Sequence, residues 1–240
     1  RFKTVTLVNK EKITDDICIL TFDRKIDIQA GQFVFLWIPG LGEKPFSALT
    51  DDPFQLAVIN LGQFTDSLMH VEPGVEAYIR GPYGNAACPP EGAKIFAVAG
   101  GTGLAAVWQI ARDFGNTEIF FGARSKDRLY FIEETAAVSD LHIATDDGSC
   151  GYHGVITELL EHHLSKLSEE QLTKLIFYNC GPSQMVHAAE TIQREFCQPE
   201  QIYNAIDYLT KCGVGICGAC DSPDGSRLCV DGPFLEAADF

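Results

Sequence analysis

The segment Lys94–Ala106 reads KIFAVAGGTGLAA, an apolar run that meets a cluster of glycines and continues into small apolar residues. The apolar run predicts a buried strand over residues 94–99, and the pattern of Leu104–Phe114 predicts a helix. Gly101, Gly103 and Ala106 fit the motif G-x-G-x-x-A, whose glycines let the backbone approach a pyrophosphate at the start of a helix. The alternative is a tight strand-to-helix turn without a ligand, because this motif alone is weakly specific.

Beyond this turn, strand-like and helix-like patterns alternate along the chain. The expected elements are strands at Glu118–Phe121, Leu141–Ala144 and Leu175–Tyr178, and helices at Val155–Leu164 and Ser183–Phe196. Strands that alternate with helices indicate βαβ units and a parallel sheet. We therefore expect an α/β parallel-sheet nucleotide-binding domain over residues 93–200.

The N-terminal part of the chain has a β pattern. Short β-rich runs, punctuated by Gly and Pro, fall at Ile17–Phe22, Gln32–Trp37, Gln55–Ile59 and Glu76–Arg80, with a helical turn or two near Thr65–Val71. Such spacing suggests a small barrel or sandwich over residues 1–90. The sequence CPPEG at 88–92 marks the boundary, because two adjacent prolines interrupt regular structure.

The C-terminal part, residues 201–240, is rich in Cys and Gly and has few residues for a core of its own. Cys212, Cys217, Cys220 and Cys229 have the spacing C-x4-C-x2-C-x8-C, the plant-type arrangement of a [2Fe–2S] cluster. The intervening glycines allow backbone amides to approach the sulfurs in conformations that other residues avoid. A zinc site or a set of free thiols is the alternative, although structural zinc usually has two separated pairs of ligands.

Charge and composition limit the partners of the chain. Eighteen Lys and Arg against thirty-three Asp and Glu give a formal net charge of −15, which disfavours nucleic acid and anionic lipid. The start of the sequence has no apolar signal region, and the longest uncharged run, Ile95–Ala111, is interrupted by glycines. We expect a soluble, cytoplasmic protein with no membrane partner. The remaining cysteines are expected to be inert buried thiols: Cys18, Cys88, Cys150, Cys180 and Cys197.

Several motifs together resemble the ferredoxin reductase-type flavoproteins. They are KPFS at 44–47, GPYG at 81–84, the glycine turn, and CGPSQM at 180–185, in the order of that family. The cysteine loop that ends in CVDGPF at 229–234, with ATDDGS at 144–149, is similar to the electron-transfer subunits of type B dihydroorotate dehydrogenase. This resemblance implies a β-barrel domain that binds FAD, an α/β domain that binds NAD(P), and a small C-terminal [2Fe–2S] lobe.

The resemblance also implies roles for particular residues. Lys44, Pro45, Phe46 and Ser47 would lie along the flavin, with the Ser47 hydroxyl at the N5 edge where hydride arrives. Ala57, Val58 and Ile59 would contact FAD through the backbone, and Phe64 and Thr65 would lie on its phosphate side. Gly101 and Gly103 would face the nicotinamide dinucleotide, and Cys180, Gly181 and Pro182 would lie near the nicotinamide ring.

By the same resemblance, the partner is an FMN-containing subunit that oxidises dihydroorotate to orotate in pyrimidine biosynthesis, with NAD(H) as the co-substrate. Equivalent subunits of a hydrogenase, a sulfide dehydrogenase or an NAD(P)H–ferredoxin oxidoreductase are alternatives, as is a zinc-stabilised binding module. Lys44 replaces the usual Arg, Ala106 replaces the usual Pro, and the spacer after Cys220 is short.

Two further features leave questions open. NADH and NADPH are both compatible with the sequence, because Arg124, Ser125 and Arg128 could accept a 2′-phosphate, although the resemblance favours NADH. His162 and His163 end a predicted helix, where positive charge suits the helix dipole, and the sequence gives little reason for a metal role.

Overall fold

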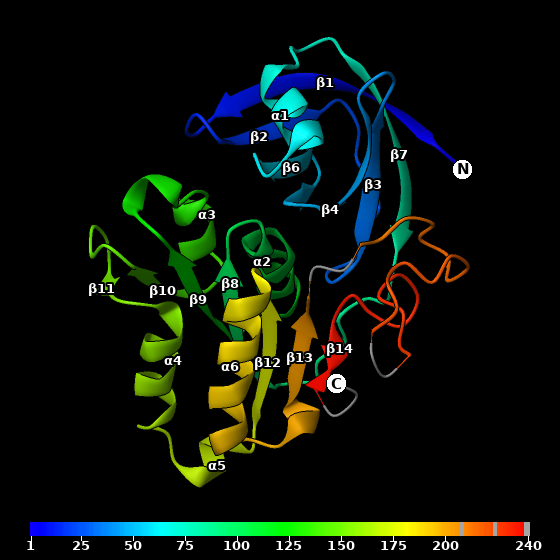
Figure 1. Ribbon diagram of the computed structural model, residues 1–240. Coiled ribbons are helices and arrows are strands. Elements are labelled where there is room, and N and C mark those ends of the chain that lie inside the picture. The colour runs from blue at the N-terminus through cyan, green and yellow to red at the C-terminus, as the bar shows by residue number, and fades with distance from the viewer. Residues whose placement is uncertain (207–208, 223–224, 238–240) are drawn as a thin grey trace.

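The computed structural model describes residues 1–206, 209–222 and 225–237, and it contains two sheets stacked one above the other (Figure 1). The first is a curled antiparallel sheet of seven strands in the order β4-β3-β7-β1-β2-β6-β5. Its elements are β1 (Lys3–Lys12), β2 (Ile17–Phe22), β3 (Phe33–Ile38), β4 (Gly42–Ser47), β5 (Thr50–Asp51), β6 (Phe54–Ile59), α1 (Gln63–His70) and β7 (Glu76–Tyr83). Apolar residues two apart, such as Val5 and Leu7, point into the core that α1 closes.

The second sheet also has seven strands, in the order β11-β10-β9-β8-β12-β13-β14, and all pairs are parallel except the last. Its strands are β8 (Lys94–Gly100), β9 (Thr117–Ala123), β10 (Asp140–Thr145), β11 (Tyr152–His153), β12 (Leu175–Cys180), β13 (Ile202–Ala205) and β14 (Leu235–Glu236). Its helices are α2 (Gly103–Phe114), α3 (Ile132–Ala136), α4 (Ile156–Leu164), α5 (Glu169–Leu172) and α6 (Ser183–Phe196), with short 3-10 turns at Lys126–Arg128 and Pro199–Gln201. Helix α2 packs on the sheet face toward the barrel, and α4 and α6 cover the other face. The predicted fold class is confirmed.

The two sheets share an apolar interface. Ile19 and Ala57 of the barrel are buried in one cluster with Ala97 and Leu104 of the α/β domain. Ion pairs also cross this interface, from Arg112 to Asp51 and from Arg128 to Asp16, the latter with 2.8 Å between Nη2 and Oδ2. Burial of this shared apolar surface keeps the barrel and the glycine turn in a fixed relation.

The interface changes the pKa of the Asp16 carboxyl group. A hydrogen bond from Thr14 Oγ1, at 2.8 Å, and the guanidinium of Arg128 lower the pKa of Asp16 below its usual value. Both interactions favour the ionised carboxylate. The interface ion pair is therefore maintained at neutral pH.

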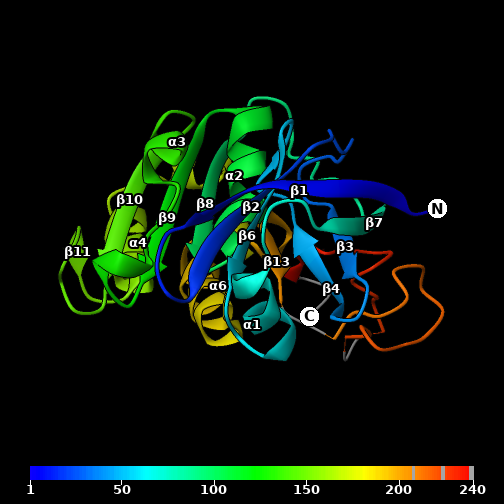
Figure 2. The same cartoon turned by 90° about the horizontal axis from the view of Figure 1, so that it is seen from above.

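The C-terminal segment is tied to both sheets. β13 lies beside β12, which extends the parallel sheet past residue 200. A buried amide network fixes this pairing: Asn179 Nδ2 donates to Gln193 Oε1 at 2.7 Å and to Asn204 Oδ1 at 2.8 Å. The cysteine loop then runs along the ends of β3 and β7, as both ribbon views show (Figures 1 and 2). None of the helices in the described part of the chain has the length and apolar character that a bilayer span requires.

Candidate redox site

The cysteine loop holds its sulfurs close to backbone amides. The N–H groups of Val214 and Ile216 donate to Cys212 Sγ, each at 3.4 Å, and the N–H of Gly215 donates to Cys229 Sγ at 3.2 Å. Gly215 has a φ of +74°, a left-handed conformation that aims its amide inward and that glycine adopts without strain. This arrangement suits thiolates and the inorganic sulfides of a cluster, which need amide donors around them.

The four thiols lie close enough to affect one another: Cys212 interacts with Cys217, and Cys229 interacts with both Cys220 and Cys212. Hydrogen bonds from the amide of Val214 and its neighbours lower the pKa of Cys212 to about 6. Burial raises the pKa of Cys229 to about 11, and the neighbouring Cys220 adds to this. Four neighbouring cysteines with amide donors around them match the four protein ligands of a [2Fe–2S] cluster, so the residues present fit the expected group.

The loop is docked on the barrel through aromatic side chains. Cys220 and Cys229 are buried in one apolar cluster with Phe33 and Phe35 of β3, and Tyr83 of β7 packs against the same cluster. The Tyr83 ring lies so close to Gly213 that a Cβ there would be 3.1 Å from it. The cysteine loop therefore lies directly on the barrel strands β3 and β7.

Arg80 connects the barrel to the first cysteine. Its Nη1 donates to the carbonyl oxygen of Cys212 and its Nη2 to that of Lys211, both at 2.6 Å. The same guanidinium makes a bidentate ion pair with Glu43, at 2.6 and 2.7 Å, and lies 3.7 Å from the centre of the Phe35 ring. These contacts raise the pKa of Arg80, chiefly through Glu43. Sequence reasoning missed this residue, whose one signal is an Arg immediately before the GPYG segment.

The expected flavin segment, Lys44–Ser47, lies in β4 at the edge of the barrel sheet. An edge strand tolerates Pro45, which lacks an N–H for the ladder. Lys44 is exposed and Ser47 is half-buried. In the pairing with β3, Ser47 lies opposite Phe33, which is buried in one apolar cluster with Cys220 and Cys229. Ser47 therefore lies one strand away from the cysteine loop.

The other expected FAD residues lie in β6 and α1. Val58 is buried in the barrel core and Ala57 in the domain interface, which leaves the strand backbone and the half-buried Ile59 for a ligand. Phe64 is buried under the barrel. The Thr65 hydroxyl accepts two backbone N–H bonds, at 2.9 and 3.0 Å, from the turn before α1.

The glycine turn meets two of the other expected segments. Gly101 has a φ of +54°, and a Cβ on it would lie 3.4 Å from Ile59 Cδ1 in the barrel. A Cβ on Gly103 would lie 2.0 Å from the carbonyl oxygen of Cys180, so only glycine fits there. Packing against the backbone of Cys180 therefore requires glycine at position 103, whether or not a ligand binds there. The structure thus brings Ile59, Gly101, Gly103 and Cys180 together.

The CGPSQM segment packs under the same turn. Met185 Sδ would be 2.7 Å from a Cβ on Gly100, and Pro182 Cδ would be 3.0 Å from it. A Cβ on Gly181 would lie 2.9 Å from the Gly100 amide nitrogen. Tyr130, whose pKa burial raises, donates its hydroxyl to the carbonyl oxygen of Gly101 at 3.1 Å. These contacts fix the turn and the Cys180–Pro182 backbone side by side.

Comparisons with known proteins place the chain in a family. Residues 97–191 match a family model described as an oxidoreductase NAD-binding domain, and residues 209–240 match the iron-sulfur cluster binding domain of dihydroorotate dehydrogenase B. A protein of Methanocaldococcus jannaschii, described as a probable dihydroorotate dehydrogenase B (NAD(+)) electron transfer subunit, is 37% identical over 94% of this chain and 87% of its own length. A protein of the same description from Pyrococcus abyssi is 36% identical over 93% of this chain and 85% of its own length.

The chain belongs to the family of dihydroorotate dehydrogenase B electron transfer subunits. The resemblance inferred from the motifs is thereby confirmed.

Solved structures show how widely this family's fold is shared. A chain of an NADH-dependent reduced ferredoxin–NADP oxidoreductase, studied for flavin-based electron bifurcation, matches with a TM-score of 0.86 and 25% identity over 98% of this chain and 88% of that one. A ferredoxin NADP+ reductase from Neisseria gonorrhoeae, with bound FAD and NADP, matches with a TM-score of 0.69 and 19% identity over 85% of this chain and 98% of that one. The second likeness concerns the fold alone.

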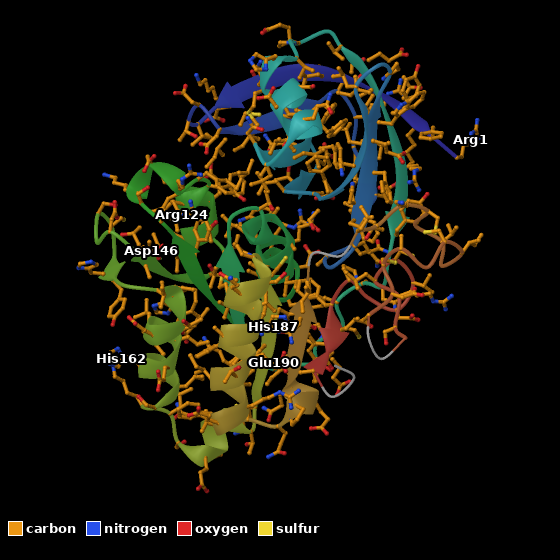
Figure 3. The ribbon with its side chains drawn as sticks, in the orientation of Figure 1. Arg1, Arg124, Asp146, His162, His187 and Glu190 are labelled. Carbon is orange, nitrogen blue, oxygen red and sulfur yellow. The ribbon has the colours of Figure 1, made fainter. Side chains whose placement is uncertain are left out.

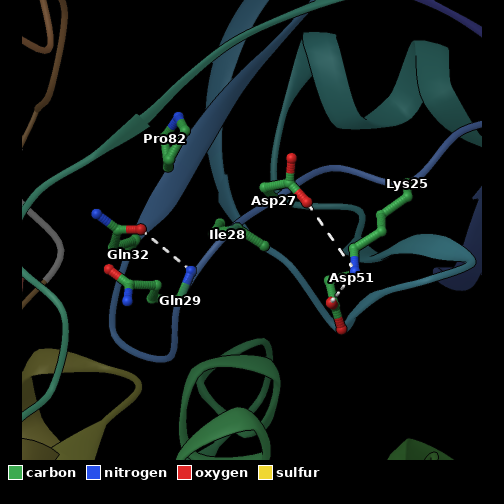
Figure 4. A pocket seen from close by; sticks show the side chains of 7 residues that line it. All are labelled: Lys25, Asp27, Ile28, Gln29, Gln32, Asp51 and Pro82. Carbon is green, nitrogen blue, oxygen red and sulfur yellow. Dashed lines mark hydrogen bonds and ion pairs between the residues drawn. The ribbon is translucent and has the colours of Figure 1, made fainter.

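Two cavities lie apart from the expected site residues. One, of about 520 Å³, is lined by Lys25, Asp27, Ile28, Gln29, Gln32, Asp51 and Pro82 (Figure 4). Lys25 Nζ spans it between Asp27 and Asp51, at 4.0 and 3.9 Å from their carboxylate oxygens. The other, of about 430 Å³, lies between the barrel and Phe131. Neither cavity is lined by a residue that the sequence analysis expected to bind FAD, NAD or the iron–sulfur cluster.

The residues that could accept a 2′-phosphate are partly engaged. Arg128 is ion-paired with Asp16, and the Ser125 hydroxyl donates to Asp127. Arg124 is exposed at the end of β9, on the same side of the domain as Asp146, as Figure 3 shows. Of the three candidates, two therefore already have partners within the protein.

Proposed function

We propose that this chain passes electrons between NAD(H) and the catalytic subunit of a dihydroorotate dehydrogenase. When bound, FAD exchanges hydride with the nicotinamide, and the [2Fe–2S] cluster carries single electrons to and from the partner. The observation that supports this most strongly is the position of the cysteine loop on β3, one strand away from Ser47. The strand that would hold the flavin and the loop that would hold the cluster are therefore neighbours in the fold.

On the barrel side, we propose that Lys44–Ser47 line the flavin. Ser47 would orient the N5 edge through its hydroxyl, and exposed Lys44 would offer a point charge to phosphate rather than the fork of an Arg. The backbone of Ala57–Ile59 would contact FAD, since the Ala57 and Val58 side chains are buried elsewhere. Phe64 and Thr65 would lie on the phosphate side, where Thr65 keeps the turn before α1 closed.

On the nicotinamide side, we propose that Gly101 and Gly103 present backbone amides to the dinucleotide at the start of α2. Cys180, Gly181 and Pro182 would line the nicotinamide ring, held there by the contact between Gly103 and Cys180. NADH fits better than NADPH, because the Arg128 guanidinium already binds the Asp16 carboxylate. The four ligands of the cluster would be Cys212, Cys217, Cys220 and Cys229.

The partner, by the same proposal, is an FMN-containing subunit that docks over the cysteine loop. Among the described residues, four of the ten exposed large apolar side chains lie in this lobe: Leu209, Val214, Ile216 and Val230, with Ile216 83% exposed. Exposed apolar residues around a redox centre indicate a protein interface. We also propose a cytoplasmic location, since a reducing compartment keeps thiols such as the exposed Cys88 and Cys217 reduced.

Co-purification of the tagged chain with its native partner tests the proposal. The complex is expected to oxidise dihydroorotate and reduce NAD+, and the isolated chain to reduce an artificial acceptor with NADH alone. A partner that is a hydrogenase, a sulfide dehydrogenase or a ferredoxin-dependent enzyme would contradict the assignment to dihydroorotate. A colourless chain with stoichiometric zinc would contradict the electron transfer role as a whole.

A further inference from the structure

Three metal-binding side chains converge far from the cysteine loop. Glu118 of β9, His142 of β10 and His163 of α4 each offer one ligand atom, and these atoms all lie within 4.8 Å of one another. β9 and β10 lie toward one edge of the second sheet, while β13 and β14, which lead into and out of the cysteine loop, lie at the other. The cluster is thus a separate feature of the molecule.

The fold makes this convergence rigid. Glu118 and Phe120 are two residues apart in β9, and Phe120 pairs with His142 in β10, so all three side chains lie on the face that α4 covers. The Phe120 ring stacks on His142 at 4.6 Å between centroids and meets the edge of His163 at 5.2 Å. All three ligand residues are half-buried.

Further contacts surround the ligand atoms. His163 Nδ1 lies 3.0 Å from the carbonyl oxygen of Leu159, a contact that directs Nε2 away from the helix backbone. Glu118 Oε1 lies 3.1 Å from Lys94 Nζ, and Oε2 lies 2.8 Å from His142 Nε2. A metal ion would take the place between Glu118 Oε2 and His142 Nε2, and Lys94 Nζ would remain beside Oε1.

We propose that Glu118, His142 and His163 bind a divalent transition metal ion of the zinc class. Two imidazoles and one carboxylate form a three-ligand set that zinc takes with a fourth position open, at about 2.0–2.2 Å from each ligand atom. His163 lies in the last turn of α4, where the carbonyl ends of the helix favour a cation. The bound ion would link β9, β10 and α4 to one another.

This site was not expected from the sequence, because its ligands are separated by more than twenty residues at each step. His163 by itself has the ordinary explanation of a positive charge at a helix end. The structure adds the two strand residues that make it part of a ligand set. The proposal is independent of the function proposed for the flavin and the cluster.

Titration of the holoprotein with Zn²⁺ tests the site by isothermal calorimetry. The wild-type chain is expected to bind one Zn²⁺ that His163→Ala weakens by at least about 10-fold, because one of three ligands is lost. His162→Ala is the matched control: His162 is exposed on the same helix (Figure 3), and its removal is expected to leave the affinity unchanged. Equal affinity in wild type and His163→Ala would overturn the proposal.

Two more variants separate ligation from a structural role. His142→Gln keeps a hydrogen-bonding side chain beside Glu118, so it should melt like the wild type in EDTA yet lose the rise in melting temperature that Zn²⁺ gives the wild type. Lys94→Met removes a positive charge next to the carboxylate and should tighten Zn²⁺ binding several-fold. A Zn²⁺-induced rise in melting temperature that persists in His142→Gln would count against the site. Weaker Zn²⁺ binding by Lys94→Met would do the same.

Discussion

Arg80→Met should weaken the docking of the cysteine loop on the barrel. The substitution keeps much of the apolar stem but removes two hydrogen bonds of 2.6 Å to the carbonyls of Lys211 and Cys212. It also leaves Glu43, which is 28% exposed, without its ion-pair partner. Bonds to a charged donor contribute about 1.5–3 kcal/mol each, and breaking a buried pair costs about 3–5 kcal/mol. Arg80 and Glu43 both belong to the barrel, so the loss of their pair weakens the barrel itself. The two bonds to the loop decide docking, and because one of them is exposed we expect their loss to cost about 2–4 kcal/mol against docking of the loop.

That energy corresponds to about 30- to 700-fold in the equilibrium between docked and undocked loop. The assay is the rate at which a strong iron chelator bleaches the cluster, together with the electron paramagnetic resonance spectrum of the reduced protein. Arg80→Met should lose its cluster faster and show a broadened spectrum, and Arg80→Lys should recover part of the effect by keeping the charge. Arg112→Met, which breaks a different ion pair between the domains, is the control. Unchanged bleaching and an unchanged spectrum in Arg80→Met would refute the reasoning.

Three other predictions concern the flavin, the turn and the interface. Ser47→Ala should slow flavin reduction by NADH about 10-fold in stopped-flow measurements while FAD stays bound; normal reduction would place the flavin elsewhere. Gly103→Ala should prevent folding or cost more than about 3 kcal/mol in urea unfolding, whereas Gly62→Ala, where a Cβ meets open space, should be tolerated. Because the pKa of Asp16 is lowered in the folded state, its stabilisation is present above about pH 4 and is lost as the pH falls further. Thermal melts should therefore show the wild type losing its advantage over Asp16→Asn in acid, and an advantage that does not change with pH would contradict this.

The sequence predicted those elements whose pattern is local. The strand Ile17–Phe22 and the helix Ser183–Phe196 have the bounds that were expected, because apolar periodicity alone defines them. The strand Lys3–Lys12 was missed, because half of its residues are exposed and show no continuous apolar pattern. Its stability comes from pairing with β2 on one side and β7 on the other. β13 was missed because it depends on the amide network of Asn179, which joins residues distant in sequence.

The same distinction applies to the candidate site. The cysteine spacing predicts the loop because its ligands and glycines are sequence neighbours. Arg80 was missed because its partners Glu43 and Cys212 lie 37 and 132 residues away. Gly103 was expected for a nucleotide, while the structure shows in addition that Cys180 leaves no space for a side chain there. Only tertiary structure brings such partners together.

The path of the electrons is tested most directly by anaerobic addition of NADH, followed by electron paramagnetic resonance of rapidly frozen samples. The wild-type chain should show flavin bleaching and the signal of one reduced [2Fe–2S] cluster, compared with full reduction by dithionite. Cys217→Ser should bleach its flavin and give no such signal, because it lacks one of the four proposed iron ligands. A wild-type chain that contains neither iron nor acid-labile sulfide, or a Cys217→Ser chain with an unaltered signal, would contradict the account.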